Sequence, residues 1–457
     1  MGNRVFSKGA LVIYLIFIVV CILLSTSSTD NTLDIAVEGE KYGDSVYTRF
    51  QDDVYALIPD DGYYKIDSAD IHSFNPLRKD LYESQIAKDK NNVYCGNRIL
   101  PNLDPKSLTV LNYEYFSDGV HTYYCSRNTS SNNDLSVFGE LSQTIVYNFK
   151  LGAKPQRLIY PFVELPKNSI YRSLPEHGFA TDGKQAYYRG LPLARSNPES
   201  LRRINTITGE RNGKLSDDFF ADGQHVYFHD QLLPLTDDPS LYGFYFGAWN
   251  LPLLYDPRIG MVYLRTLAFD KNNAPYEVVN TDDGHGHHLL FSSKEGLFYF
   301  DTETNLLKRE RRNPFLPGDF SPLSNYVFHW GQKVLYLETS EVWGRNKSPG
   351  LKSRSTHIYQ LANVTDEQWQ QMGDVSYDSG AVWKNGDSYY YLDELGDSQG
   401  IHGAIYRIAD NQTVQLLLTD NLTKTLNSAD ILQLIEEKKL TVPAHTELLE
   451  IKTKYDF

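Results

Sequence analysis

The sequence predicts an all-β fold of repeated antiparallel hairpins, of the β-propeller-like type. A short pattern recurs along the first half of the chain: an aspartate, then three polar or turn-forming residues, then strand formers. Tyrosine, with 33 copies against 22 phenylalanines and 5 tryptophans, is the commonest aromatic residue, and tyrosine favours strands. Alternating strand and turn signals then continue towards the C-terminus, as expected for propeller blades in series.

The recurring pattern is clearest at residues 89–95, 118–124, 182–188 and 222–228. Aspartate can accept a hydrogen bond from the backbone two residues further on, and the glycine that follows it in three copies tolerates a positive φ, so the pair closes a turn. Strand formers follow, and a second turn such as Arg189-Gly190 leads into an apolar return strand. Each copy therefore predicts a β-hairpin.

An Asp-Pro or Asn-Pro step follows three of the copies, at Asp104-Pro105, Asn197-Pro198 and Asp238-Pro239. The Asp or Asn side chain can cap a single helical turn that proline begins, because the missing N–H of proline is not needed at that position. A leucine comes shortly after each step, and we expect it to fix the turn to the core.

This combined pattern resembles that of the DKNYY family, repeat proteins of bacterial envelopes named for the consensus Asp-Lys-Asn-Tyr-Tyr. Residues 89–94 (Asp-Lys-Asn-Asn-Val-Tyr) match it best, and the resemblance covers about residues 80 to 242. Cys95 replaces the second tyrosine, and the copy at Asp118 lacks the Asp-Pro step. The resemblance implies an extracytoplasmic repeat protein of unknown biochemical role, with no catalytic residue and no cofactor.

The N-terminus predicts a membrane anchor. Arg4 and Lys8 precede the uncharged run of residues 9–29, and Asp30 ends it. As a helix this run is roughly 31 Å long, enough to cross a bilayer core. The charge distribution predicts a single-pass inner-membrane protein with its N-terminus in the cytoplasm and its body in the periplasm. The alternative is a signal cleaved after the small residue Ser27, which would give a secreted protein.

These signals divide the chain into four segments. They are a membrane anchor or signal segment (1–29), a polar spacer (30–45), DKNYY-type β repeats (46–245), and further propeller-like β hairpins with a short C-terminal helix (246–457). The helix is predicted over residues 428–439 from early acid, late base and an apolar stripe. Residues 144–148 and 414–418 are apolar enough to be interpreted as strands.

The body contains two cysteines, Cys95 and Cys125, each at the end of a repeat strand. A disulfide between them would suit an oxidising compartment. Alignment of the copies places Cys125 one residue later than Cys95, which in a simple register turns the two side chains to opposite faces. Two buried free thiols are therefore the alternative to a disulfide.

Residues 282–288 (Asp-Asp-Gly-His-Gly-His-His) form one run with metal-ligand character. In an extended chain His285 and His287 face one side, with carboxylates nearby and His288 next in line. A plain exposed turn is the alternative. The chain has no His-Glu-x-x-His or Cys-x-x-Cys motif, and we do not expect an enzyme.

The net charge of −14 argues against nucleic acid as a partner. In each tyrosine pair we expect one ring in the core and the other on a solvated face. The predicted function is a membrane-anchored binding or scaffold module whose partner is an envelope protein or a glycan. The alternatives are an extracytoplasmic hydrolase or metal-binding protein, and an immunity-type protein against a secreted toxin.

Overall fold

The structure, a computed structural model, describes residues 32–77, 84–149, 151–167, 169–206, 214–246, 251–280, 288–301, 306–315, 320–330, 333–344, 350–364, 368–376, 379–396, 399–419 and 426–454. The predicted anchor at 9–29 and the candidate ligands His285 and His287 lie outside these residues. Among the residues described, no helix is long and apolar enough to cross a membrane.

The chain forms two compact units, unit 1 (Met1–Leu201) and unit 2 (Arg202–Phe457). Their boundary differs from the one expected between residues 245 and 246, where the repeat signature fades. Strand β23 (Tyr242–Phe246) runs up to that expected boundary and pairs with β24 (Leu251–Asp256) beyond it. The fading signature therefore marks a change in turn sequence within one continuous series of sheets.

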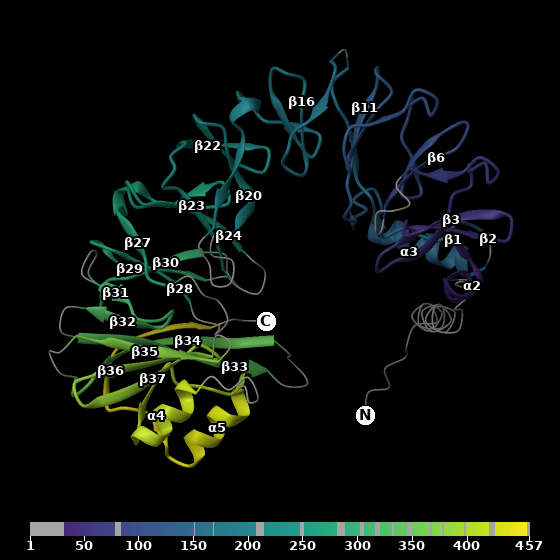
Figure 1. Cartoon of the computed structure of the whole chain (residues 1–457). Helices are drawn as coiled ribbons and strands as arrows, with labels where there is room; N and C mark the ends of the chain where they lie inside the picture. The colour runs from purple at the N-terminus through teal and green to yellow at the C-terminus, as the bar shows by residue number, and fades with distance from the viewer. Residues whose placement is uncertain are drawn as a thin grey trace, which may run out of the picture. The chain divides into compact units, whose positions relative to one another are not determined.

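Unit 1 is a series of antiparallel sheets, which follow the chain order in Figure 1. Sheet 1 contains β1 (Glu40–Lys41), β2 (Tyr47–Phe50), β3 (Asp53–Ile58) and β4 (Gly62–Lys65). Sheet 2 contains β5 (Asn75–Pro76), β6 (Ile86–Lys88), β7 (Val93–Cys95) and β8 (Arg98–Ile99). Sheet 3 contains β9 (Thr109–Val110), β10 (Tyr115–Ser117), β11 (Thr122–Cys125) and β14 (Phe162–Glu164). Sheet 4 contains β15 (Arg172–Ser173), β16 (Phe179–Thr181), β17 (Ala186–Tyr188) and β18 (Leu191–Pro192), and the 3₁₀ turn η1 (Pro198–Ser200) follows it.

Unit 2 continues with longer strands. Sheet 5 contains β19 (Arg202–Asn205), β20 (Leu215–Ala221), β21 (His225–Phe228) and β22 (Gln231–Thr236). Sheet 6 contains β23, β24, β25 (Met261–Leu264) and β26 (Leu267–Ala268), and the 3₁₀ turn η3 (Lys271–Asn273) leads to sheet 7, which contains β27 (Tyr276–Val278), β28 (Leu289–Ser293), β29 (Gly296–Asp301) and β30 (Leu306–Glu310). Sheet 8 contains β31 (Phe320–Pro322), β32 (Val327–Trp330), β33 (Lys333–Gly344), β34 (Gly350–Leu361) and β40 (His445–Lys454). Sheet 9 contains β35 (Gln370–Val375), β36 (Gly380–Asn385), β37 (Ser388–Asp393), β38 (Ile405–Ile408) and β39 (Leu440–Thr441).

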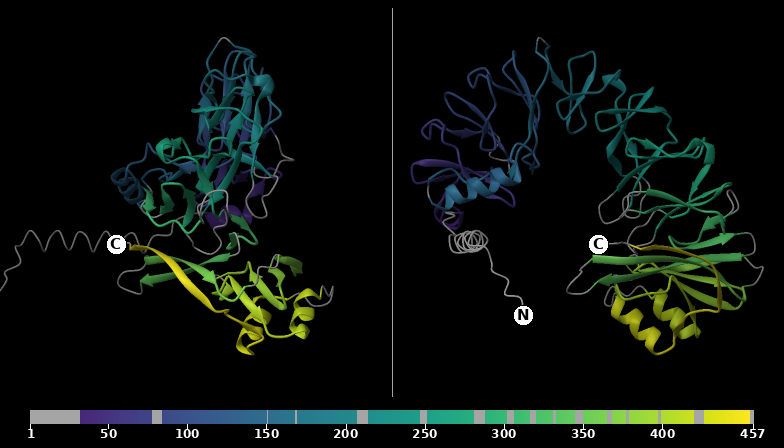
Figure 2. Two further views of the ribbon diagram at one scale, coloured as in Figure 1. Left: turned by 90° about the vertical axis from the view of Figure 1, so that its left-hand side faces the viewer. Right: turned by 180° about the vertical axis from the view of Figure 1, so that it is seen from behind.

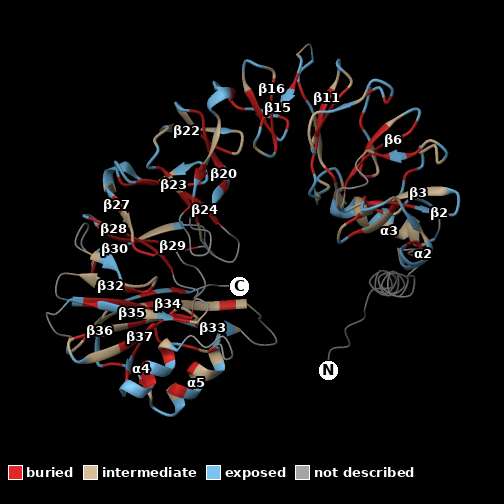
Figure 3. Cartoon of the chain, in the orientation of Figure 1, coloured by how far each residue is buried: buried red, intermediate tan, exposed pale blue. Residues whose placement is uncertain are grey.

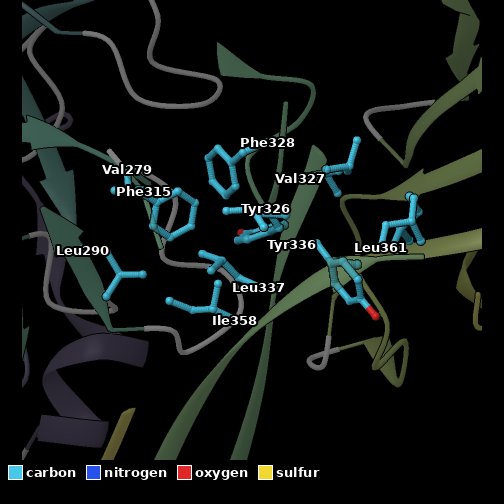
Figure 4. Close-up of a cluster of buried hydrophobic side chains, with 14 of the residues drawn as sticks. Val279, Leu290, Phe315, Tyr326, Val327, Phe328, Tyr336, Leu337, Ile358 and Leu361 are labelled. Atoms are coloured by element: carbon cyan, nitrogen blue, oxygen red, sulfur yellow. The ribbon is translucent and has the colours of Figure 1, made fainter. Parts of the chain in front are cut away.

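Neighbouring sheets within a unit pack face to face, so that most strands are buried on both faces (Figure 3). In β24, Leu253 packs into a core shared with sheet 7, whereas the next residue, Leu254, packs into a core shared with sheet 5. Side chains alternate between the two faces of a strand, and each face meets a different neighbour. Figure 4 shows another such core in unit 2, where the rings of Phe315 and Phe328 lie 5.4 Å apart.

The tyrosine pairs follow the same rule, and the expectation of one solvated ring in each pair is wrong. Tyr123 is 1% exposed and Tyr124 is 4% exposed, and they belong to separate cores. Tyr187 and Tyr188 are also both buried. The expectation assumed a sheet with one wet face, as in many antiparallel folds, whereas stacking covers both faces here.

The repeated aspartate closes the turn between the two central strands of its sheet. Asp89 accepts hydrogen bonds from the backbone N–H groups of Asn91 and Asn92, at 2.7 Å each, and from the hydroxyl of Tyr94 at 2.7 Å. A further N–H, that of Asp70, donates to the same carboxylate at 2.8 Å. The consensus spacing of Asp and Tyr thus has a physical cause, because the tyrosine reaches back to the aspartate from the following strand.

The same arrangement recurs in both units. Asp182 accepts from the N–H groups of the two residues that follow Gly183, and Asp222 accepts from those that follow Gly223. These glycines have φ of +85° and +86°, a conformation that disfavours other residues. Tyr227 donates to Asp222 at 3.0 Å. The predicted cap is also present, because the Asn197 side chain accepts from the N–H of Glu199 at the start of η1.

Several local predictions were wrong, for identifiable reasons. The predicted spacer folds onto sheet 1: α2 (Thr32–Glu38) buries Ile35, and β1 pairs with β2. Residues 144–148 belong to helix α3 (Val137–Asn148), which begins at the cap Ser136. Residues 414–418 belong to helix α4 (Asn411–Leu418), which Asp410 caps. In α3 and α4 a helix cap outweighs a local strand preference.

The predicted C-terminal helix is confirmed. Helix α5 (Ser428–Glu436) begins with a reciprocal capping box between Asn427 and Asp430. It buries Ile431 and Leu434 in a core shared with α4 and sheet 9, and Figure 2 shows both helices on the same side of that sheet. The propeller prediction is supported only at its coarser level, as consecutive antiparallel meanders. No strand pairing that closes them into a ring is found in the part of the chain that the structure describes.

The Asp89 carboxylate is expected to stabilise unit 1 more than the Tyr94 hydroxyl alone. Burial by itself raises the pKa of Asp89, but the hydrogen bonds that it accepts outweigh burial and hold the pKa below its ordinary value. We expect Asp89→Asn to lower the free energy of unfolding by about 2 to 3 kcal/mol and Tyr94→Phe by about 1 kcal/mol, measured by denaturant unfolding of unit 1 at neutral pH.

Because the pKa of Asp89 is lowered in the folded state, its contribution is present above the unfolded value of about 3.9 and is lost as the pH falls through the folded value. The gap between wild type and Asp89→Asn should therefore narrow in acid. Asp134→Asn, at an exposed aspartate of the same unit, is the control. Equal effects of the substitutions at 89 and 134 would contradict the role assigned to the turn.

Candidate functional site

A pocket of about 800 Å³ lies in unit 1, where sheets 1, 2 and 3 meet a long insertion. The insertion leaves sheet 3 after β11 and returns as β14. It contains the two-stranded sheet of β12 (Ser130–Ser131) and β13 (Leu158–Ile159) together with helix α3. It replaces the short hairpin return of the other copies, which explains why the copy at Asp118 departs from the pattern. Helix α2 contributes Ile35 to the pocket wall, and α3 contributes Tyr147.

Sheet 1 holds the end of the insertion in place. The buried carboxylate of Asp61 accepts hydrogen bonds from the backbone N–H groups of Arg157 and Leu158, at 2.8 and 2.9 Å. The Tyr64 hydroxyl donates to the carbonyl of Pro155 at 2.8 Å, and the Lys154 ammonium donates to the carbonyl of Asp61 at 2.7 Å. Hydrogen bonds to charged groups stabilise more than neutral ones, so this wall of the pocket is pre-formed.

Four half-buried aromatic rings from three parts of the unit surround the pocket. They are Tyr55 and Tyr63 of sheet 1, Tyr147 of α3 and Phe162 of β14. The Arg98 guanidinium lies over the Phe162 ring, 4.6 Å from its centre, which holds both side chains at the pocket. Rings of this kind offer flat apolar faces together with polar hydroxyl edges.

Two side-chain amides add directional hydrogen-bonding groups. Asn97 donates to the Gln156 carbonyl oxygen at 3.1 Å, and Gln156 donates to the Asn97 carbonyl oxygen at 2.8 Å. A side-chain amide has two N–H groups and two lone pairs on its oxygen. Each of these amides therefore keeps one donor and one acceptor for a ligand, in a fixed orientation.

The pocket is locally basic in an acidic protein. Its lining includes the three cations Lys65, Arg98 and Lys154, against the single carboxylate of Asp67 among the described lining residues. Lys65 pairs with Asp53 at 2.9 Å, and that hydrogen bond raises the pKa of the lysine. Arg98 has no carboxylate within ion-pair distance among the described residues, so its charge is available to an anionic ligand.

The chemistry of the pocket favours binding. Hydrolysis of a glycosidic bond generally uses a pair of carboxylates, and Asp67 is the only one among the described lining residues. The same described lining contains no histidine and no cysteine. A second, more polar pocket of about 600 Å³ in unit 2 is bordered by Asp410, but that carboxylate already caps α4 and pairs with Lys439 at 3.1 Å.

His288, a candidate metal ligand, bridges two sheets of unit 2. Its ring nitrogen Nδ1 lies 2.9 Å from the Thr356 hydroxyl of β34, and Nε2 lies 3.0 Å from the Thr453 hydroxyl of β40. A metal ion would have to displace one of these hydroxyls. No group of three or more His, Cys, Asp or Glu side chains suited to a metal ion is found among the described residues, and the proposal for His285 and His287 stays a prediction.

Burial of His288 makes unit 2 sensitive to acid. Burial, and then the nearby positive charge of Arg354, lower the pKa of His288 to about 3. The unfolded histidine has a pKa of about 6.5, so from about pH 6.5 down to about pH 3 the unfolded chain binds a proton that the folded chain does not. The contribution of neutral His288 to the free energy of unfolding is therefore fully present above about pH 6.5, the pKa in the unfolded chain, and is lost as the pH falls towards the folded pKa.

We expect the unfolding free energy of unit 2 to fall between pH 7 and pH 5 by about 2 kcal/mol more in the wild type than in His288→Asn. Denaturant unfolding of unit 2 at the two pH values provides the measurement. His72→Asn, at an exposed histidine of unit 1, is the control and should leave the pH dependence of unit 2 unchanged. An identical pH dependence in wild type and His288→Asn would contradict this role.

Cys95 and Cys125 are joined in a disulfide, with their Cα atoms 6.1 Å apart. The shift of one register position, which seemed to argue against this bond, has the opposite meaning in stacked sheets. When equivalent sheets stack, the upper face of one packs against the lower face of the next. Residues that meet between sheets 2 and 3 therefore come from opposite faces of the two sheets. Cys125 therefore shares a core with Cys95 and Tyr123. Tyr124, which lies between Tyr123 and Cys125 in β11, faces the next core.

Sequence reasoning missed the residues that line the pocket. Tyr63 lies before the first clear copy of the pattern, and Gln156 lies in the insertion, of which only residues 144–148 were interpreted, as a strand. The available signal was the long gap between the copies at Asp118 and Asp182, with its Ser136 cap and apolar helical stripe. Nothing in the local sequence indicates that this insertion packs back onto sheet 1.

The fold defines an all-β repeat protein built from stacked antiparallel sheets, and the pocket lies on an insertion within the repeats. The DKNYY family model matches residues 47–231. Over this segment the match confirms the resemblance that the sequence pattern predicted. The match begins at β2 and ends in β22, and it includes the whole pocket insertion. No curated protein and no solved structure matches the chain.

Proposed function

We propose that this protein is a non-enzymatic binding module of the bacterial cell envelope, anchored in the inner membrane, and that unit 1 binds an acidic glycan in its aromatic pocket. The observation that carries the proposal is the combination, in one pocket, of half-buried rings, a fixed amide pair and an excess of cations. Apolar pockets with a few oriented polar groups are typical ligand sites.

Each part of the pocket suits one part of a sugar chain. The tyrosine rings offer faces for the C–H side of a pyranose ring. The remaining donors and acceptors of Asn97 and Gln156 match hydroxyl or acetamido groups. The Arg98 guanidinium favours a carboxylate, which it can bind through two parallel hydrogen bonds. An acidic amino sugar, such as the muramic acid of the cell wall, presents all three kinds of group.

Two observations support an extracytoplasmic location. The disulfide joins sheets 2 and 3 in the core of the matched segment, and such bonds persist in oxidising compartments. The run of residues 9–29 is long enough to cross a bilayer, with basic residues before it and acid after it. In this proposal the run stays attached as a single membrane-spanning helix, with the N-terminus in the cytoplasm.

Binding can be measured by calorimetry on the full chain in nanodiscs, with the disaccharide of N-acetylglucosamine and N-acetylmuramic acid as the probe. Loss of the Arg98 charge should remove a charge-assisted hydrogen bond, so we expect Arg98→Ala to weaken binding about 10-fold to 100-fold. Tyr63→Ala should weaken both this probe and the neutral disaccharide chitobiose, because it removes a stacking face.

Lys106→Ala, at an exposed cation of unit 1 outside the pocket, is the matched control and should bind as the wild type does. Unchanged unfolding midpoints would show that the pocket variants still fold. Absence of binding by the wild type, or equal effects of Arg98→Ala and Lys106→Ala, would contradict the proposed glycan site.

A further inference from the structure

The two helices that border the pocket carry apolar side chains that none of the described residues of unit 1 covers. Helix α3 has no buried residue. Phe138 is 85% exposed, and Leu141 and Phe149 are also exposed, at a spacing that places them with Ile145 along one side of the helix. In a surface helix of a globular protein such an apolar stripe normally packs against the core. We therefore expect an apolar partner to cover this stripe.

Helix α2 repeats the arrangement on a smaller scale. Leu33 and Val37 are each 76% exposed, and residues four apart lie on the same side of a helix. Ile35, on the other side, is buried and lines the pocket. Tyr147 likewise lines the pocket from the side of α3 opposite the stripe. Both helices therefore turn one side to the pocket and an apolar side away from it.

The sequence before α2 identifies the apolar partner within reach. The uncharged run ends at Thr29, and α2 begins at Thr32, so two residues, spanning about 7 Å at full extension, separate them. As a helix the run is roughly 31 Å long, which matches the hydrocarbon core of a bilayer. If the whole run spans the bilayer, no part of it is available to cover α3. The bilayer surface then lies next to α2.

We propose that the exposed apolar sides of α2 and α3 insert into the interface of the bilayer that holds the N-terminal anchor. This inference rests on the anchoring in the proposed function and adds to it that unit 1 lies against the membrane. Helices with an apolar stripe bind membranes in this manner, with the stripe buried at the boundary between headgroups and acyl chains. Because the protein is acidic overall, it gains no electrostatic attraction to anionic lipids. The contact therefore depends on apolar burial and suits a zwitterionic lipid surface.

The test uses the full chain reconstituted in vesicles of phosphatidylcholine, some of it brominated near the headgroup end of the acyl chains. Phe138→Trp and Leu33→Trp place a fluorophore on each helix. The control, Val120→Trp, replaces a residue that is 66% exposed and lies in the turn before β11, away from the end of the strand where the insertion leaves. We expect several-fold stronger quenching of the added fluorescence at 138 and 33 than at 120, with blue-shifted emission at the two helix positions only.

The outcomes separate docking from anchoring. Equal, weak quenching at 138 and 120 in a chain that stays in the vesicles after alkaline extraction would overturn the docking and leave the anchor intact. Blue-shifted emission at 138 without quenching would overturn it too, because protein and not lipid would then cover α3. Release of the chain by alkaline extraction would contradict the anchor itself, and the docking with it.

Discussion

An aspartate carboxylate at the central turn of a sheet, buried at Asp89 and Asp222 and half-buried at Asp118 and Asp182, is the interaction on which the repeat depends. The strands that it joins in sheets 2 and 4 have three residues each, too few for their ladder hydrogen bonds alone to fix a hairpin. The carboxylate of Asp89 orders two backbone N–H groups of its turn and binds the hydroxyl of Tyr94 on the following strand. One side chain thus sets the turn, the start of the next strand and the position of a large core residue.

Burial on both faces explains why tyrosine and not phenylalanine dominates. A ring that crosses from one sheet to the next reaches backbone groups that would otherwise lack partners, and its hydroxyl can satisfy them. Tyr47 of sheet 1 donates to the Gln85 carbonyl beside sheet 2 at 2.6 Å, and Tyr115 of sheet 3 donates to the Gly178 carbonyl beside sheet 4 at 3.0 Å. Burial raises the pKa of Tyr115 far above its ordinary value, so the hydroxyl remains a donor. Sheets of so few residues are stabilised by such contacts between them.

The sequence predicted the features that are local and repeated. The turn at Asp182, the cap at Asn197 and the capped helix after Asn427 depend on neighbouring residues, and the structure contains all of them. Features that depend on distant contacts were missed. Tyr124 is buried because sheet 4 covers the face of sheet 3 on which it lies. The pocket wall at Gln156 depends on an insertion that packs against Asp61. The cysteine register was interpreted for one flat sheet, and two stacked sheets reverse its meaning.

The pocket and the two apolar helices follow from the same constraint. Where the repeat is regular, neighbouring sheets cover both faces of each sheet, and little surface remains for a ligand. The insertion between β11 and β14 departs from the repeat within unit 1. It brings the Tyr147 ring and the exposed helix α3 next to Arg98 of sheet 2 and the tyrosines of sheet 1. Function is thus expected where the repeat is interrupted, which is consistent with the general association of binding sites with loops on a rigid scaffold.

Thiol labelling at two adjacent residues of one strand tests the stacking most directly. Leu253→Cys and Leu254→Cys, each in a chain with Cys21→Ser, place a thiol on either face of β24, and Leu267→Cys gives an exposed reference on the same sheet. We expect the thiols at 253 and 254 both to stay unreactive until denaturant unfolds unit 2, while the thiol at 267 reacts at once. Rapid labelling at either 253 or 254 under native conditions would show that one face of the sheet is open, and would contradict the stacked arrangement.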